Sequence, residues 1–170
     1  MQTIVAQLDA VHQQLLDTVR PISVEQFAHR PSQTEWSIAE VIHHLYLVEK
    51  LAVESLEKAL KRPPEELSLL RRMLLPPPAV IGWRGIRVRA PKVVEPLDAP
   101  SKQQTLENYN GVRDALKKIT NHGRERLEKM VLKHLVLGLH NGVYAVQLAH
   151  YHEVRHFKQI QEIIKNLGKN

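Results

Sequence analysis

The last fifth of the chain holds a group of histidines with spacing that suits metal binding. The stretch HYHEVRHFKQI, residues 150–160, contains His150, His152 and His156. On a helix, His152 and His156 project from one face about 40° apart, whereas His150 lies on the far side. Two such imidazoles can bind one metal ion, with Gln159 one turn further on as an outer partner. The spacing equally fits buried histidines that only form hydrogen bonds, so a metal site needs another ligand.

A second histidine pair, His43 and His44, offers that ligand. His44 falls on the flank of an apolar face that includes Val41, whereas His43 lies nearer the solvent side. His44 is therefore the better candidate to meet the first pair inside a fold. Glu40 lies one turn before His44, where it either orients the imidazole or forms a surface salt bridge.

Composition limits the chemistry. The chain has 10 histidines and no cysteine, so disulfides, thiolate sites and cysteine nucleophiles are excluded, and a metal must be bound through nitrogen and oxygen. Its net charge of +6 is spread along the chain without a phosphate loop or an RNA-binding motif, so nucleic acid is not an expected partner. Neither a signal-peptide pattern nor a membrane-length apolar run occurs, so we expect a cytoplasmic protein.

The histidines need helices to position them, and four segments have apolar residues at helical spacing. These segments are residues 3–20, 37–60, 102–121 and 142–166. Ser37 and Asn141 are suitable N-caps for the second and fourth. Residues 128–141 are apolar but irregular, and strand-like alternation is scarce. The sequence predicts one all-α domain over residues 1–170, a four-helix up-and-down-type bundle.

A long Pro-rich irregular excursion, residues 61–104, separates the second and third helices. It contains eight of the ten prolines, which a regular bundle helix cannot accommodate. A short helix around 67–74 is compatible with the pattern. The basic residues Arg84, Arg87, Arg89 and Lys92 could cover the site and bind an acidic substrate group, or belong to a solvated loop.

The two histidine segments also resemble a known family, the DinB/YfiT-like superfamily. In that family a Trp-Ser opens the second helix and a His-Leu follows eight residues after the Trp, as in EWSIAEVIHHLYLVE, where this histidine is His44. The stretch GLHNGVYAVQLAHYHEVRHFKQIQEI resembles the family's last helix, and its H-x-x-x-H matches His152 and His156. The resemblance is looser over residues 61–104.

This resemblance implies a site and partners. Its members are four-helix bundles that hold a divalent metal ion, nickel or zinc, on three histidines, which here are His44, His152 and His156. It further implies a small-molecule substrate, including low-molecular-weight thiols, and a homodimer. The apolar residues of VLKHLVLGL could supply part of the dimer interface.

The function implied is that of a metal-dependent hydrolase or a thiol-dependent S-transferase. The alternative is a non-catalytic stress-response binding module with a structural or vestigial metal. No general base is assigned, because Glu49 lies about 140° around its helix from His44 and need not face the metal.

Overall fold

The computed structural model describes residues 2–83, 90–134 and 136–167. Its elements, in chain order, are the helices α1 (Gln2–Val19), α2 (Val24–Ala28), α3 (Ile38–Leu60) and α4 (Leu69–Leu74), the 3-10 helices η1 (Pro78–Gly82) and η2 (Lys92–Val94), the helices α5 (Lys102–Thr120) and α6 (Gly123–Glu128), the strands β1 (Val131–His134) and β2 (Gly138–Asn141), and the helix α7 (Gly142–Leu167).

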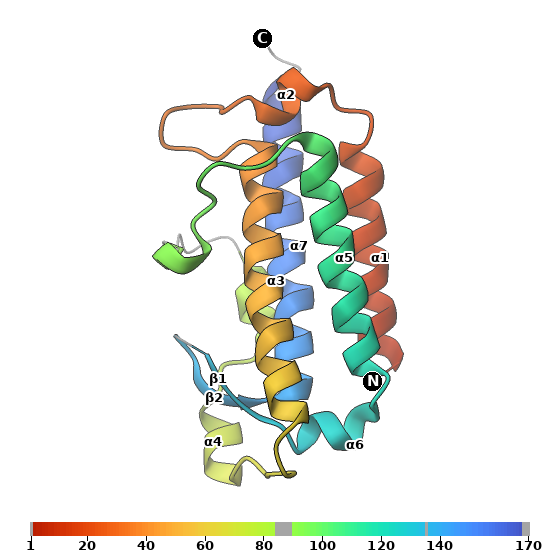
Figure 1. Cartoon of the computed structure of the whole chain (residues 1–170). Helices are drawn as coiled ribbons and strands as arrows, with labels where there is room; N and C mark the ends of the chain where they lie inside the picture. Colours follow the sequence, from red (N-terminus) through yellow and green to blue (C-terminus); the bar gives the residue numbers. More distant parts are fainter. Residues whose placement is uncertain (1, 84–89, 135, 168–170) are drawn as a thin grey trace.

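The four long helices α1, α3, α5 and α7 pack side by side around one apolar core (Figure 1). Each of them begins and ends within a few residues of its expected bounds. Their buried positions follow the helical apolar stripes, because each stripe must be removed from water against its neighbours. The four-helix bundle is therefore confirmed.

The helices do not alternate strictly in direction, as a simple up-and-down bundle would have them. In Figure 1, α1 and α7 run upward, while α3 and α5 both run downward. Lys117, near the end of α5, pairs with Asp9 on the first half of α1, at 3.1 Å. Arg126 of α6 donates to the Leu60 carbonyl at the end of α3. The excursion between α3 and α5 returns the chain along the length of the bundle, so these two helices are parallel.

Side-chain caps fix where α3 and α7, the two helices that carry His44, His152 and His156, begin. The Ser37 hydroxyl accepts from the Glu40 N–H, and the Glu40 carboxylate accepts from the Ser37 N–H, which forms a capping box. The Asn141 side chain accepts from the Tyr144 N–H at 2.9 Å. Both expected N-caps are confirmed.

Residues 128–141 were expected to be irregular, and this expectation was wrong. The strands β1 and β2 pair antiparallel, with Leu132 opposite His140. These two side chains are buried while Lys133 and Leu139 are exposed, so the alternation is real but too short to stand out. Gly138 has φ 73°, a conformation that glycine adopts without strain, and it starts the returning strand.

The excursion contacts the bundle at defined points. The backbone of Gly82 on η1 packs against Tyr151 of α7, and η2 lies against α3. The expected short helix is α4, which begins at the N-cap Ser68 and has no buried residue. Among the described helices, none has the length and apolar character needed to cross a membrane.

Candidate metal centre

Three imidazoles from two helices converge inside the bundle. His44 comes from α3, and His152 and His156 come from successive turns of α7. One nitrogen of each ring lies within 4.8 Å of the corresponding nitrogens of the other two. The ring centroids are 4.5 to 5.2 Å apart. The structure thus brings together the three histidines selected from the sequence, which we call the histidine cluster.

Two of these rings are oriented by hydrogen bonds through Nδ1. His44 Nδ1 lies 2.7 Å from the Val94 carbonyl oxygen, and His156 Nδ1 lies 2.8 Å from Gln159 Oε1. Because both partners are oxygen acceptors, each Nδ1 carries the proton, and the tautomer is assigned from these partners. Nε2 of each ring then presents a lone pair to the cluster, which is the usual arrangement for a metal-binding histidine.

The cluster contains a contact between two ring nitrogens that needs either a proton on one of them or a shared cation. Nε2 of His152 and Nε2 of His156 lie 3.2 Å apart. Since the His156 proton is on Nδ1, its Nε2 is an acceptor, and a second lone pair from His152 would be repelled at this distance. A proton on His152 or a cation shared by the rings removes the conflict. The donor set therefore fits a metal ion that accepts imidazole nitrogen.

Burial keeps the imidazoles of His44 and His152 neutral, which is the form that binds metal ions. Removal from water lowers the pKa of His44 below its usual 6.5, although its bond to Val94 opposes the shift. Burial lowers the pKa of His152 well below 6.5, and the neighbouring His156, His44 and Arg155 lower it further. Both rings are consequently neutral at pH 7, with lone pairs available.

Glu40 does not orient His44, which corrects one of the two interpretations of that carboxylate. Its oxygens accept from the guanidinium of Arg30 and from the Ser37 backbone, so it serves the start of α3. The Val94 carbonyl has the orienting role instead. Sequence reasoning missed Val94 because every residue carries a carbonyl, so its type gives no signal.

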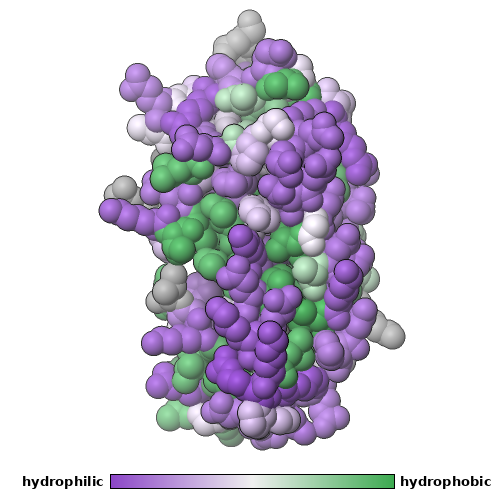
Figure 2. Space-filling model, in the orientation of Figure 1, coloured by the Kyte–Doolittle hydropathy of each residue, from purple (hydrophilic) through white to green (hydrophobic). Residues whose placement is uncertain are grey.

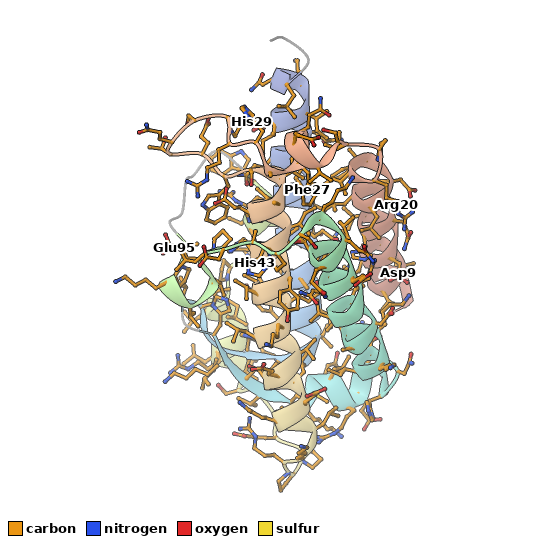
Figure 3. The ribbon with its side chains drawn as sticks, turned by 45° about the horizontal axis from the view of Figure 1, so that its top comes forward. Asp9, Arg20, Phe27, His29, His43 and Glu95 are labelled. Carbon is orange, nitrogen blue, oxygen red and sulfur yellow. The ribbon has the colours of Figure 1, made fainter. Side chains whose placement is uncertain are left out.

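The other histidines singled out in the sequence lie outside the cluster. His43 packs beside the Tyr46 ring, with 5.9 Å between centroids, and burial lowers its pKa. Figure 3 labels His43 on α3 and Glu95 just after η2. His150 lines a groove between α1 and α7, on the far side of α7 as its helical position predicts. Gln159 has the expected role of an outer partner, through its bond to His156.

The excursion supplies part of the surroundings of the cluster. Besides Val94, it contributes the backbone carbonyl of Trp83, which accepts from Arg155. The Trp36 ring, just before α3, lies 5.0 Å from the His44 ring. Of the basic residues that could either cover the site or belong to a solvated loop, Lys92 is exposed on η2, and residues 84–89 lie outside the described residues.

A second polar group is buried in the same bundle, and we call it the Arg113 network. Arg113 of α5 forms two bonds of 2.8 Å to the carboxylate of Glu49 on α3 and one of 2.9 Å to Glu153 on α7. Glu153 also accepts from Tyr109 at 2.5 Å and pairs with His12 of α1 at 3.0 Å. One ionic network thus joins all four long helices.

The charges of the network depend on one another. Burial raises the pKa of Glu49, and the charge of Arg113 opposes that shift. Burial would also raise the pKa of Glu153, but the bonds from His12 and Tyr109 and the charge of Arg113 outweigh it, and the net shift is downward. Burial alone would lower the pKa of Arg113, whereas Tyr109 and both carboxylates raise it. The sequence offered one signal: Arg113, Glu49 and Glu153 all fall within apolar helical stripes.

Comparison with known proteins places the chain in a family. Residues 7–160, which include all three clustered histidines, match the model of the DinB superfamily. The chain belongs to the DinB superfamily. This confirms the family indicated by the two histidine segments.

Other members and solved bundles resemble the chain over most of its length. YuaE of Bacillus subtilis (strain 168) is 28% identical over 152 residues, which are 89% of this chain and 91% of that protein. YfiT from Bacillus subtilis aligns with a TM-score of 0.66 at 14% identity, covering 98% of this chain and 87% of that one, and is described as having an unusual four-helix bundle topology. The four-helix bundle protein TT2238 aligns with a TM-score of 0.64 at 19% identity, covering 95% and 98% of the two chains. The DinB-like fold is therefore shared by proteins of low identity.

Proposed function

We propose that this DinB-superfamily protein is a metal-dependent enzyme that binds one divalent ion through His44, His152 and His156. The observation that carries the proposal is the convergence of three imidazole nitrogens within 4.8 Å, with Nδ1 of two rings already bonded elsewhere. Three protein ligands leave coordination positions for water or substrate, which is typical of catalytic rather than structural sites.

We propose nickel or zinc as the ion, because imidazole suits both and the chain contains no cysteine to favour softer metals. Such an ion would supply a Lewis acid that lowers the pKa of water or of a thiol at neutral pH. Burial holds His44 and His152 neutral, and Val94 and Gln159 fix the direction of the His44 and His156 rings. These residues bind and orient; none of them is assigned as a general base.

The proposed reaction is hydrolysis of a small molecule, or transfer of a low-molecular-weight thiol to one. Hydrolysis is supported by the description of YfiT as a probable metal-dependent hydrolase. Thiol transfer is supported by the resemblance to thiol-dependent members of the family. Incubation of the metal-loaded protein with ester and amide substrates, and separately with an electrophile and a small thiol, distinguishes the two by their products.

Metal depletion and reconstitution test whether the protein is an enzyme at all. A catalytic ion restores both thermal stability and turnover when added back, and turnover should be lost in His152→Ala. A structural ion in a non-catalytic binding module would change the melting temperature alone. That second outcome would reject the enzymatic proposal and favour the binding module.

We further propose that the protein forms a homodimer through α4. Its residues Leu69, Leu70, Met73 and Leu74 are each about 70% exposed, and Figure 2 shows hydrophobic residues at the surface on this side of the molecule. Together they form an exposed apolar surface on one short helix, and such surfaces often mark a site of protein–protein contact. Val136 on the neighbouring hairpin, within the segment VLKHLVLGL, is also exposed.

The charges beside this surface suit pairing with a second copy. Glu65 and Glu66 precede the apolar residues of α4, and Arg71 and Arg72 lie among them. Two copies related by a two-fold axis would place acidic residues of one near basic residues of the other. Light scattering should give twice the 19.5 kDa of one chain. Met73→Glu should reduce that mass to one chain, and a parent mass of one chain at micromolar concentration would reject the dimer.

A further inference from the structure

The Arg113 network joins the same two helices that carry the histidine cluster. Glu153 directly follows His152 on α7, and Glu49 comes five residues after His44 on α3. The guanidinium of Arg113, from α5, bonds to both carboxylates at 2.8 to 2.9 Å. One side chain from a helix without any metal ligand therefore bridges the two helices that supply the ligands.

This bridge leaves the guanidinium of Arg113 little freedom to move. The guanidinium is a planar fork, and its third nitrogen, Nη1, donates to the Leu8 carbonyl of α1 at 2.9 Å. The side chain of Arg113 is only 2% exposed and that of Glu153 only 1%, so water cannot readily replace a broken bond. Rotation of α7 about its axis would pull Glu153 away from Arg113, while the bidentate pair with Glu49 holds the guanidinium on α3.

The described hydrogen bonds between α7 and the other long helices all meet at Glu153, whereas those from Tyr144 to the Pro76 carbonyl and from Arg155 to the Trp83 carbonyl reach the excursion. On the face that carries His152, the preceding turns present the small residues Ala145 and Ala149. Apolar packing of this kind is non-directional, whereas hydrogen bonds between charged groups have strict angles and short distances. The direction of the α7 side chains is therefore set most sharply where Glu153 meets Arg113.

A metal site needs ligands whose positions and directions are fixed with this precision. Bonds from imidazole nitrogen to zinc are about 2.0 to 2.1 Å long, and a site tolerates errors of only about 0.5 Å or 10–20° in its ligands. A small rotation of α7 would carry His152 and His156 together past this limit relative to His44, because both project from the same helix.

We infer that Arg113, Glu49 and Glu153 are positioning residues, which set the rotation of α7 against α3 so that the three histidines meet. The inference rests on the proposed metal site. It also accounts for the presence of a buried ionic network, because well-packed apolar residues of similar volume often give equal or greater stability.

Titration with Co²⁺ alone tests the inference, since this ion accepts imidazole ligands and its visible spectrum reports their geometry. Arg113→Lys keeps the positive charge but cannot bond to two carboxylates as a fork. We expect its Co²⁺ affinity to fall at least about tenfold, the usual effect of losing an outer partner, with an altered spectrum. Glu49→Gln keeps the size of the side chain and removes its charge. We expect it to lower the Co²⁺ affinity and alter the spectrum in the same direction, so it tests the inference if Arg113→Lys does not fold.

Two control variants separate positioning from general loss of stability. Ile119→Ala removes apolar packing at a residue of α5 that is 5% exposed and is no member of the network. Leu116→Ala makes a cavity one turn along α5 from Arg113, at a residue that is 1% exposed and is likewise no member of the network. Measured well below their melting temperatures, both should retain the parental affinity and spectrum.

The outcomes are distinct. If the folded Arg113→Lys and Glu49→Gln variants bind Co²⁺ with the parental affinity and spectrum, the positioning role is wrong while the metal site stands. If Leu116→Ala changes the spectrum as much as they do, the effect is general instability and the role is again wrong. If the parent itself binds no Co²⁺, the proposed metal site is rejected, and the positioning role with it.

Discussion

The histidine cluster and the Arg113 network are both polar groups inside one bundle, and both connect α3 to α7. In the network, the guanidinium of Arg113 and the phenol of Tyr109 donate to carboxylates, so each of these contacts pairs a donor with an acceptor. In the cluster, the two Nε2 atoms of α7 lie 3.2 Å apart and at most one of them can donate. The first arrangement is served by groups of the chain alone, whereas in the second three ring nitrogens converge within 4.8 Å and a single N–H can serve only one pair of them.

This difference distinguishes a structural polar group from one suited to a ligand. A buried polar group that satisfies itself contributes to the uniqueness of the fold. Lone pairs that converge without enough donors cost free energy unless something from outside supplies the charge. The cluster, rather than the more extensive network, is therefore the place to look for function.

The largest expected effect comes from removing a ligand of the cluster. His152→Ala should lower the metal content of untagged protein from one divalent ion per chain to none, because the two remaining imidazoles bind too weakly. Elemental analysis measures this. His43→Ala and His150→Ala are matched controls that should keep the ion. If His43→Ala empties the site and His44→Ala does not, the assignment of ligands on α3 is wrong.

Breaking the network should instead lower the stability of the folded protein. Arg113→Met leaves Glu49 and Glu153 buried without their cation, and we expect the free energy of unfolding to fall by about 3–5 kcal/mol. Urea denaturation of the metal-free protein at pH 7 measures the loss. Replacing Glu49 with leucine in the same variant should recover part of it, because one buried carboxylate without a cation is removed. A loss under about 1 kcal/mol from Arg113→Met alone would show that the carboxylates find other partners or water.

A change of pH tests whether the imidazoles of the cluster bind the metal ion in their neutral form. The pKa values of His44 and His152 are lowered below 6.5 by burial, so metal affinity should be nearly constant between pH 8 and 7 and fall at lower pH, as protons compete for Nε2. In the metal-free protein the unfolded histidines take up protons first, near pH 6.5, so stability also declines as pH falls below that value. Calorimetric titration at several pH values checks this. An affinity already reduced between pH 8 and 7 would contradict it.

The smallest effect is expected at the start of α3. Ser37→Ala removes the side-chain cap of that helix and should cost about 1 kcal/mol of stability. The metal content should not change, since Ser37 lies two turns before His44 and, among the described residues, its hydrogen bonds join it only to Glu40 and Val41. Thermal unfolding and elemental analysis of one preparation measure both. A loss of metal in this variant would mean that the cluster depends on how α3 begins.

Much of this arrangement could be predicted from the sequence, because it depends on local periodicity. The apolar stripes give the four long helices, Ser37 and Asn141 mark two of their starts, and the four-residue spacing of His152 and His156 puts both on one face. His44 could be preferred over His43 because only one of two adjacent residues can face the core.

The rest depends on contacts between distant segments, for which a single sequence holds little information. The direction of α5 follows from how the excursion returns, and the bond from His44 to Val94 spans 50 residues and uses a backbone atom. The β1–β2 hairpin was missed because each strand has only four residues. The sequence gives one indication of the network, because Arg113 falls within an apolar helical stripe. Nothing in the sequence around Arg113 indicates which carboxylates bond to it.

The long sequence separation within the site has a consequence for folding kinetics. His12 and Glu153 are 141 residues apart, and His44 lies on the helix before the excursion while its two partners lie on the last one. Contacts of such high separation slow folding, because the intervening chain must be ordered before they are made. During synthesis, α1, α3 and α5 leave the ribosome before α7 has been made. Arg113 can therefore bond to Glu153 only at a later stage than to Glu49. The capacity to bind a metal ion should therefore be acquired only after α7 has been made and has packed against α3.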